Sequence, residues 1–202
     1  MIVIGITGII GSGKTTASNF LRKKGTTVID LDALAKKAIA LKEVQEEIAS
    51  CLGKEYIKDG NPVVERLRKD VFTNKKKLRA LESIIHPRVK EDMWKEIDRK
   101  RGTGTSFVVI DGPLLYETDL HKSLDKIAVV SADIEKIKER LRERGLSDDD
   151  MDRRMSNQIP LREKEKRADF VIFNNGTKKD LEKEIEGLLR RIKEWEVTSD
   201  AS

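Results

Sequence analysis

Residues 8–15 read Gly-Ile-Ile-Gly-Ser-Gly-Lys-Thr and match the pattern G-x-x-x-x-G-K-[ST]. Residues 1–7, which precede this stretch, are mostly apolar and β-branched, and this predicts a buried strand. Residues 16–24 after it predict a helix that ends at Gly25. A strand, a glycine-rich loop and a helix in this order form a cradle for phosphate groups, because backbone N–H groups and the positive end of the helix point at one place. This segment therefore predicts that the chain binds a nucleoside triphosphate.

The loop pattern gives individual side chains an expected role. Lys14 is expected to reach the β- and γ-phosphates, the Thr15 hydroxyl to ligate Mg²⁺, and Thr16 to contact the α-phosphate. The glycines of the loop give the backbone a freedom that other residues lack, so that successive N–H groups turn inward. The alternative, a glycine-rich turn that binds nothing, is disfavoured because a predicted strand and a predicted helix flank the loop. The expected contacts to ATP come from Gly11, Ser12, Gly13, Lys14, Thr15 and Thr16.

Length and cysteine content narrow the class of molecule. The 202 residues suffice for one sizeable core, or for one core with an inserted lobe. No apolar run reaches the roughly 18 residues of a membrane span, and the start of the chain shows no signal-peptide pattern. The single cysteine, Cys51, forms no internal disulfide. A reducing, cytoplasmic setting is the expectation that follows.

The net charge of +5 admits two kinds of partner, nucleic acid or a polyanionic small substrate. Aromatic residues make up only 4% of the chain, and many lie in apolar stripes, which disfavours a base-stacking surface. We therefore expect a small-molecule substrate, with neither nucleic acid nor membrane as partner. The chain is expected to be a monomer or a small homo-oligomer.

The second predicted strand, residues 26–30, ends in Asp30-Leu31-Asp32. Open α/β sheets place their sites at the carboxyl ends of strands, so two carboxylates here suit contact with substrate and metal. Asp32 also suits the N-cap of a helix over residues 33–40. The two roles are compatible, and the phosphate-binding loop one βα unit earlier favours the site.

A mostly helical block follows the second strand and is too long for a simple crossover. We interpret residues 33–104 as an inserted lobe that grips the acceptor substrate. His86-Pro87 is expected to interrupt the helices of this block, since proline disfavours helical angles in the residue before it. A lone histidine is more often a capping or buried residue than a ligand, and both readings of His86 stay open here.

The third strand, residues 107–111, ends in Asp111 and resembles a Walker B strand, whose acid holds Mg²⁺ directly or through water. Residues 126–130 and 170–173 predict the fourth and fifth strands. The predicted fold is therefore an α/β P-loop NTPase fold with a five-stranded parallel sheet flanked by helices. Residues 1–32 and 105–202 would form its nucleotide-binding core.

Residues 142–167 are densely charged and poor in apolar side chains. They predict two helices, residues 148–158 and 161–167, with a break at Pro160. A solvated helical hairpin with salt bridges is one interpretation. A mobile lid is the other, because phosphoryl transfer needs cations over the γ-phosphate and exclusion of water. Arg140 and Arg144 are the expected cations.

Several motifs together resemble those of the dephospho-CoA kinases, and the resemblance spans residues 1–195. In that family, ATP phosphorylates the 3′-hydroxyl of the ribose of dephospho-CoA, in the last step of coenzyme A biosynthesis. The Asp-x-Asp, His-Pro and Pro-Leu-Leu-x-Glu combination is far more specific than the phosphate-binding loop alone. The motifs are Gly-Ser-Gly-Lys-Thr (11–15), Val-Ile-Asp-Leu-Asp (28–32), His-Pro (86–87), Pro-Leu-Leu-Tyr-Glu (113–117), Arg-Ala-Asp-Phe-Val-Ile (167–172) and Asn-Asn-Gly (174–176).

The resemblance implies roles for residues outside the loop. Asp32 corresponds to the aspartate taken as the catalytic base, and His86 lies in the acceptor lobe and contacts substrate. The residues implied to line the acceptor pocket are Leu114, Leu115 and Glu117, and those implied to lie near the adenine are Asn175 and Gly176.

One position departs from the family pattern, since Ile9 stands where its loop usually has a second glycine. The Walker spacing is intact, so the change is expected to concern the fit of the loop against the acceptor side. Two alternatives to the family activity are another small-molecule P-loop kinase, acting on a nucleotide, a nucleoside or a sugar acid, and a nucleic-acid-stimulated ATPase.

Overall fold

The computed structural model describes residues 1–58, 60–63, 66–67, 70–71 and 74–199. The chain forms two compact units. The first comprises Met1–Ile29 and Lys100–Ser202, and the second comprises Asp30–Arg99. Residues 30–32, expected in the nucleotide-binding core, fall in the second unit, and residues 100–104, expected in the inserted lobe, fall in the first.

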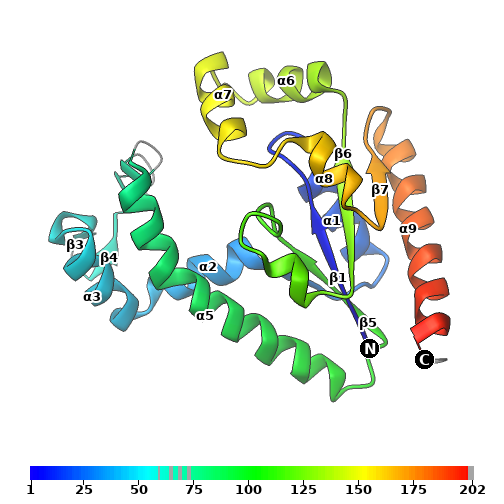
Figure 1. The fold of residues 1–202 in the computed structure, drawn as a ribbon, viewed down its shortest axis with the longest axis horizontal. Coiled ribbons are helices and arrows are strands. Elements are labelled where there is room, and N and C mark those ends of the chain that lie inside the picture. Colours follow the sequence, from blue (N-terminus) through cyan, green and yellow to red (C-terminus); the bar gives the residue numbers. More distant parts are fainter. Residues whose placement is uncertain (59, 64–65, 68–69, 72–73, 200–202) are drawn as a thin grey trace. The chain divides into compact units, whose positions relative to one another are not determined.

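A five-stranded sheet forms the centre of the first unit (Figure 1), and its strand order is β2-β5-β1-β6-β7. The parallel pairs include β1 with both β5 and β6, and β6 with β7. The sheet confirms the predicted architecture. The five strands are β1 (Ile2–Thr7), β2 (Val28–Asp30), β5 (Phe107–Asp111), β6 (Lys126–Ser131) and β7 (Phe170–Phe173).

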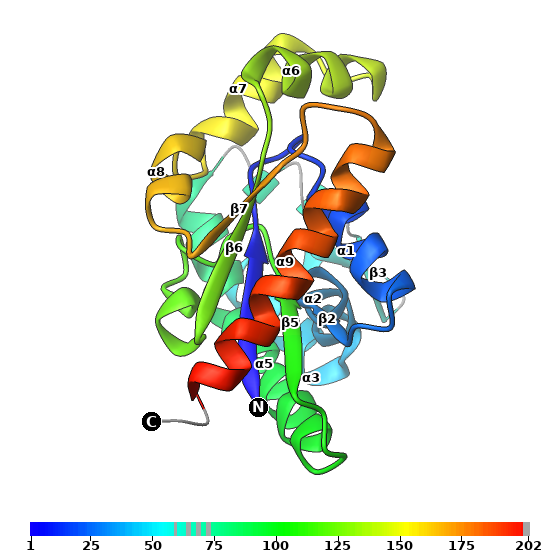
Figure 2. The ribbon, with the colours of Figure 1, turned by 90° about the vertical axis from the view of Figure 1, so that its right-hand side faces the viewer.

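Two helices cover one face of this sheet, α1 (Lys14–Lys23) and α9 (Lys178–Ser199). Figure 2 shows α9 running along the sheet beside α1. Alternate residues of β1, from Ile2 through Ile4 to Ile6, point into the core that these helices close. Burial of each such side chain stabilises the fold by about 1.5–3 kcal/mol, so this face fixes the register of the central strand.

Three further α-helices of the first unit follow β6, namely α6 (Ile134–Glu143), α7 (Asp148–Ser156) and α8 (Leu161–Lys166). A short 3₁₀ helix, η2 (Leu120–Ser123), precedes β6. The two helices predicted between residues 148 and 167 are therefore present, each ending slightly earlier than expected. Arg142 and Asp148 form an ion pair here, with N and O 3.1 Å apart, as a charged helical hairpin would.

The second unit is mostly helical, as predicted. The elements are α2 (Leu31–Ala40), α3 (Lys42–Cys51), η1 (Lys54–Tyr56), β3 (Ile57–Lys58), β4 (Asn61–Pro62) and α5 (Lys75–Arg101). Its core gathers Val44 and Ile48 of α3 with Tyr56 of η1 and Ile84 of α5. A small antiparallel hairpin of β3 and β4 is the exception within this helical unit.

The expected interruption at His86-Pro87 is wrong, because α5 runs through both residues. Proline removes one helical hydrogen bond and disfavours helical angles before it. The buried side chains before and after it, such as Ile84 and Val89, hold the helix in one piece. Tertiary packing therefore outweighs the local preference at this point.

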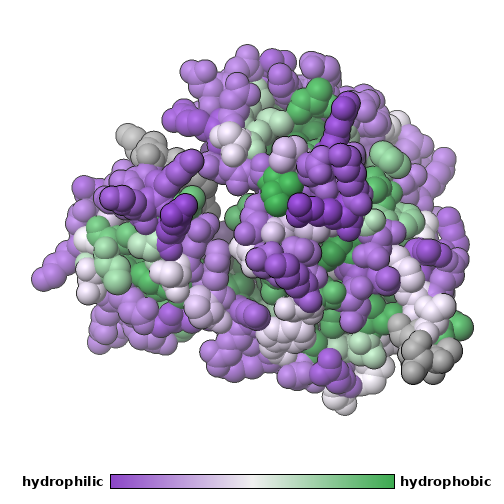
Figure 3. Space-filling view, viewed as in Figure 1, coloured by the Kyte–Doolittle hydropathy of each residue, from purple (hydrophilic) through white to green (hydrophobic). Residues whose placement is uncertain are grey.

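The surface is largely polar. Figure 3 shows mostly hydrophilic side chains on the visible face, with apolar residues gathered in small patches. The large apolar side chains exposed among the described residues include Leu41, Ile134, Phe173 and Val197. In the part of the chain that the structure describes, no helix combines the length and apolar character needed to cross a bilayer.

Candidate active site

The glycine-rich loop leaves β1 and enters α1, and its glycines allow the backbone to turn there. Gly13, the N-cap of α1, has φ 98°, in the left-handed region that favours glycine. Gly8 does not have a positive φ. A Cβ there would lie 2.6 Å from both the Val130 carbonyl oxygen and the Ser12 Oγ, so this glycine supplies space rather than an unusual angle. The loop is thus shaped by two different properties of glycine.

Lys14 and Asp111 form an ion pair at the carboxyl ends of the central strands. Their side chains are only 13% and 4% exposed. The parallel register sets Asp111 beside Ile6 of β1, just before the loop begins. A lysine of the loop and the acid of the neighbouring strand therefore meet at the carboxyl ends of the parallel strands, the edge where open α/β sheets place their sites.

The donor groups near this ion pair fit a magnesium ion. Thr15 follows Lys14 and is exposed in the first turn of α1, where its hydroxyl is a hard oxygen ligand. In the ranges described, no group of three or more His, Cys, Asp or Glu side chains could hold a metal. Magnesium commonly takes only one or two protein ligands together with water and substrate phosphates. Thr15 and Asp111 suit that mode of binding.

Asn174 joins the turn after β7 to the glycine-rich loop. Its Nδ2 donates to the Ser12 carbonyl oxygen at 2.8 Å, and its backbone N–H donates to the Ser131 carbonyl oxygen at 2.7 Å. A Cβ at Gly13 would lie 2.0 Å from the same Nδ2. The sequence placed Asn174 in the Asn-Asn-Gly motif but gave a role only to the next two residues, because the contact of Asn174 with Ser12 depends on the folded chain.

Asn175 and Gly176, expected near the adenine, form the turn between β7 and α9. The Asn175 Oδ1 accepts the Asp133 backbone N–H at 2.7 Å, and its Nδ2 donates to the Asp133 carboxylate at 2.9 Å. Lys136 also donates to the Asn175 carbonyl oxygen. The turn is therefore held against the start of α6.

The two arginines predicted as cations differ in placement. The Arg140 Nη2 donates to the Asn174 carbonyl oxygen at 2.7 Å. Its Nη1 is buried and has no hydrogen-bond partner among the residues that the structure describes. Arg144 is the exposed residue that ends α6. Arg140 is thus anchored beside the loop by the same turn that Asn174 anchors, whereas Arg144 lies at the helix end.

The loop after β5 carries the three residues implied for the acceptor pocket. Leu114 is partly exposed, and Glu117 is 16% exposed at its side chain. Leu115 is fully buried, and a Cβ at Gly5 would lie 2.7 Å from its Cδ1. The Leu115 side chain therefore packs in the core beneath the loop, and its contact with the acceptor stays a prediction.

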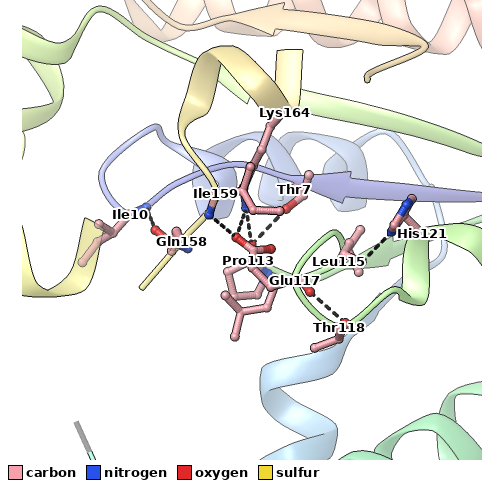
Figure 4. A network of polar contacts seen from close by, with 11 residues as sticks. Thr7, Ile10, Pro113, Leu115, Glu117, Thr118, His121, Gln158, Ile159 and Lys164 are labelled. Atoms are coloured by element: carbon pink, nitrogen blue, oxygen red, sulfur yellow. Dashed lines mark hydrogen bonds and ion pairs between the residues drawn. The ribbon is translucent and has the colours of Figure 1, made fainter. Parts of the chain in front are cut away.

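Glu117 is held by a second segment of the chain (Figure 4). Its Oε1 accepts the Ile159 backbone N–H at 2.8 Å and lies 2.8 Å from the Lys164 Nζ. The Gln158 Oε1 accepts the Ile10 backbone N–H at 3.0 Å. The segment between α7 and α8 thus contacts both the glycine-rich loop and the loop after β5. The sequence indicates Glu117 through its motif, but it does not indicate that Ile159, Gln158 or Lys164 contacts these loops.

The second unit carries Asp32 and His86. The helix cap is Asp30, whose carboxylate accepts the Ala33 backbone N–H at 3.0 Å, so the capping interpretation of Asp32 is wrong. Asp32 lies in the first turn of α2 and is exposed. His86 is exposed near the middle of α5. Capping and core packing, the alternatives for a lone histidine, therefore do not describe His86.

Comparisons with known proteins point to one family. A family model described as dephospho-CoA kinase matches residues 2–180. The dephospho-CoA kinase of Fusobacterium nucleatum subsp. nucleatum is 39% identical over 194 residues, which cover 95% of this chain and 99% of that protein. Among solved structures, TT1252 from Thermus thermophilus has a TM-score of 0.80 at 37% identity, covering 94% of this chain and 97% of that one. The dephospho-CoA kinase from Campylobacter jejuni has a TM-score of 0.70 at 25% identity, covering 94% and 96%.

Proposed function

The chain belongs to the dephospho-CoA kinase family, and we propose that it transfers the γ-phosphoryl group of ATP to the 3′-hydroxyl of the ribose of dephospho-CoA. The products are CoA and ADP, which makes the chain a phosphotransferase with an alcohol group as acceptor. The observation that carries the proposal is the Lys14–Asp111 ion pair at the mouth of the glycine-rich loop. It supplies the donor half of a kinase site.

Transfer proceeds by in-line attack. The 3′-oxygen forms a bond to the γ-phosphorus while the bond from that phosphorus to the β,γ-bridging oxygen breaks, and ADP leaves. Asp32 orients the attacking hydroxyl and accepts its proton. His86, Leu114 and Glu117 contact the acceptor.

Charge on the moving phosphoryl group is offset by fixed cations. Lys14 contacts the β- and γ-phosphates, and the amides of residues 11–16 hold the phosphate oxygens. Arg140 adds a cation there, which is supported by its bond to the carbonyl oxygen of Asn174, the residue whose side chain donates to the Ser12 carbonyl oxygen. Arg144 adds a second cation when residues 142–167 act as a lid. Asn175 and Gly176 border the adenine.

Thr15 and Asp111 are the residues that would hold Mg²⁺. The ion supplies charge neutralisation on the phosphates when bound. Removal of divalent cation with a chelator is expected to abolish turnover, and added Mg²⁺ is expected to restore it.

A panel of acceptors tests the proposal. The purified chain is incubated with ATP, Mg²⁺ and one acceptor at a time, and ADP release is measured. We expect release with dephospho-CoA and little with nucleoside monophosphates, nucleosides, shikimate or gluconate. A preference for one of those acceptors would show a different small-molecule kinase. ADP release that depends on DNA or RNA alone would show a nucleic-acid-stimulated ATPase.

A further inference from the structure

Lys164 is a buried charge inside a charged helix. The sequence of α8 is Leu-Arg-Glu-Lys-Glu-Lys, and Lys164 has 0% exposed surface. A lysine is almost never fully buried unless its ammonium group is paired, because removal of the charge from water is costly. The fold therefore holds this ammonium group in a defined place.

Within the described residues, the ammonium group contacts two oxygen atoms of the loop after β5 (Figure 4). The Lys164 Nζ donates to the Pro113 carbonyl oxygen at 2.9 Å and contacts the Glu117 Oε1 at 2.8 Å. The Pro113 carbonyl oxygen also accepts the Thr7 hydroxyl at 3.1 Å. Thr7 is the last residue of β1 and Pro113 follows shortly after Asp111, so one carbonyl joins the ammonium group to both strand ends of the site.

Glu117 has one oxygen occupied and one unused. Its Oε1 receives both Ile159 and Lys164, as described above. Its Oε2 is buried and accepts no hydrogen bond within the described ranges of the chain. Two donors on one oxygen fix the carboxylate plane, and the second oxygen keeps its capacity to accept.

We propose that Lys164 is a positioning residue for phosphoryl transfer, which fixes Glu117 and the loop 112–118 for contact with the acceptor. The inference rests on the proposed function. Lys164 contacts no substrate itself, because its side chain has no exposed surface. It acts through Glu117 and the Pro113 carbonyl oxygen, and it thereby links α8 to the acceptor side of the site.

The first test compares Lys164→Met with Lys166→Met. Both changes remove a lysine charge from α8, but Lys166 is 71% exposed and pairs with Glu163 of the same helix. We expect Lys164→Met to lower kcat/KM for dephospho-CoA by about 100-fold, the cost of a small misplacement. ATP affinity, measured by calorimetry, should stay within about threefold of the wild type. Lys166→Met should stay within about twofold in both quantities.

A double variant keeps the test decisive if Lys164→Met folds poorly. Lys164→Met leaves Glu117 as an unpaired buried charge, whereas Lys164→Met with Glu117→Gln removes both charges and should restore stability. The inference predicts that the double variant folds, binds ATP and remains slow, with a loss smaller than the product of the two single losses. Turnover of the double variant within about threefold of the wild type, or fully multiplicative losses, would overturn it.

ADP release by the wild type shows whether a negative result contradicts this inference or the proposed function. If the wild type releases no ADP with dephospho-CoA but does so with another acceptor, the proposed function fails, and the variants are compared with that acceptor. If the wild type is active and Lys164→Met matches it in kcat and acceptor KM, the positioning role fails.

Discussion

The ion pair of Lys14 and Asp111 is almost completely buried. Removal of one partner from a buried ion pair leaves the other charge without compensation. The pair therefore links the stability of the first unit to the same groups that serve the nucleotide. Lys24, which pairs with Glu182 and Glu186 on the surface, offers a matched contrast.

Lys14→Ala is expected to weaken ATP binding and turnover together, and to lower the free energy of unfolding by about 3 kcal/mol. Asp111 then stays buried with no cation beside it. Urea denaturation and calorimetric ATP titration measure the two effects. Lys24→Ala should leave both quantities unchanged, since exposed pairs add little. Undiminished ATP affinity in Lys14→Ala would contradict the assigned phosphate contact.

Asp32→Asn tests the proton acceptor. The amide keeps nearly the size of the carboxylate but takes no proton at neutral pH. We expect ATP affinity to stay near the wild-type value while kcat falls by about 100- to 10,000-fold, the usual contribution of a general base. Rapid-quench turnover with saturating ATP and dephospho-CoA measures the loss. A kcat close to that of the wild type would remove Asp32 as the base.

Lys164 gives the unfolding free energy a defined pH dependence. Burial lowers the pKa of its ammonium group below the ordinary 10.5, although the bond to Glu117 opposes the shift. Between the folded and unfolded pKa values the unfolded chain holds a proton that the folded protein has released, so the free energy of unfolding rises with pH there. The full cost of burying the charge applies below both values.

The measurement is urea denaturation of the wild type and Lys164→Met at about pH 8, 9 and 10. Other titrating groups largely cancel in the difference between the two proteins. We expect the difference to move in favour of the wild type as the pH rises. A difference that moves in favour of Lys164→Met would show that the native pKa of Lys164 is not lowered.

At the scale of elements, Ile9 connects the glycine-rich loop to the helices after β6. It is 6% exposed and shares a cluster with Ile137 and Leu141 of α6 and Met151 of α7. This explains the departure from the family's usual glycine, because the side chain fills an apolar space between loop and helices. The loop thus gains a hydrophobic contact that a glycine lacks.

Ile9→Ala is expected to lower the free energy of unfolding by about 2–4 kcal/mol, as for other buried large-to-small changes. Thermal and urea denaturation measure the loss. Ile134→Ala in α6 is the control, because its side chain is 43% exposed and the change should stay within about 0.5 kcal/mol. Equal effects of the two substitutions would show that Ile9 is not packed as described.

Helix α5 shows the limit of local rules at this scale. His86-Pro87 predicts a break, yet the stripe that includes Ile84, Val89 and Met93 keeps the helix continuous. The hairpin of β3 and β4 has strands too short to leave an alternating pattern. Both features depend on packing within the second unit, which a single sequence does not reveal.

For the whole molecule, hydrophobic patterns and helix-capping residues were enough to predict the five-stranded sheet and helices α1, α2, α7 and α8. The apolar β-branched runs before Gly8 and up to Asp111 marked the central strands, and parallel order then brought Lys14 to Asp111. The burial of Lys164 could not be predicted, because no pattern in its own segment indicates it. Its neighbours are charged and exposed, and only the strand ends beneath α8 make it a core residue.

The products of the reaction test the central claim most directly. Phosphorus NMR and mass spectrometry of a reaction with ATP, Mg²⁺ and dephospho-CoA follow both substrates at once. The account predicts one ADP for each dephospho-CoA consumed, and a new phosphomonoester on the 3′-oxygen of the ribose. ADP formed without consumption of dephospho-CoA, or a phosphate on any other atom, would contradict it.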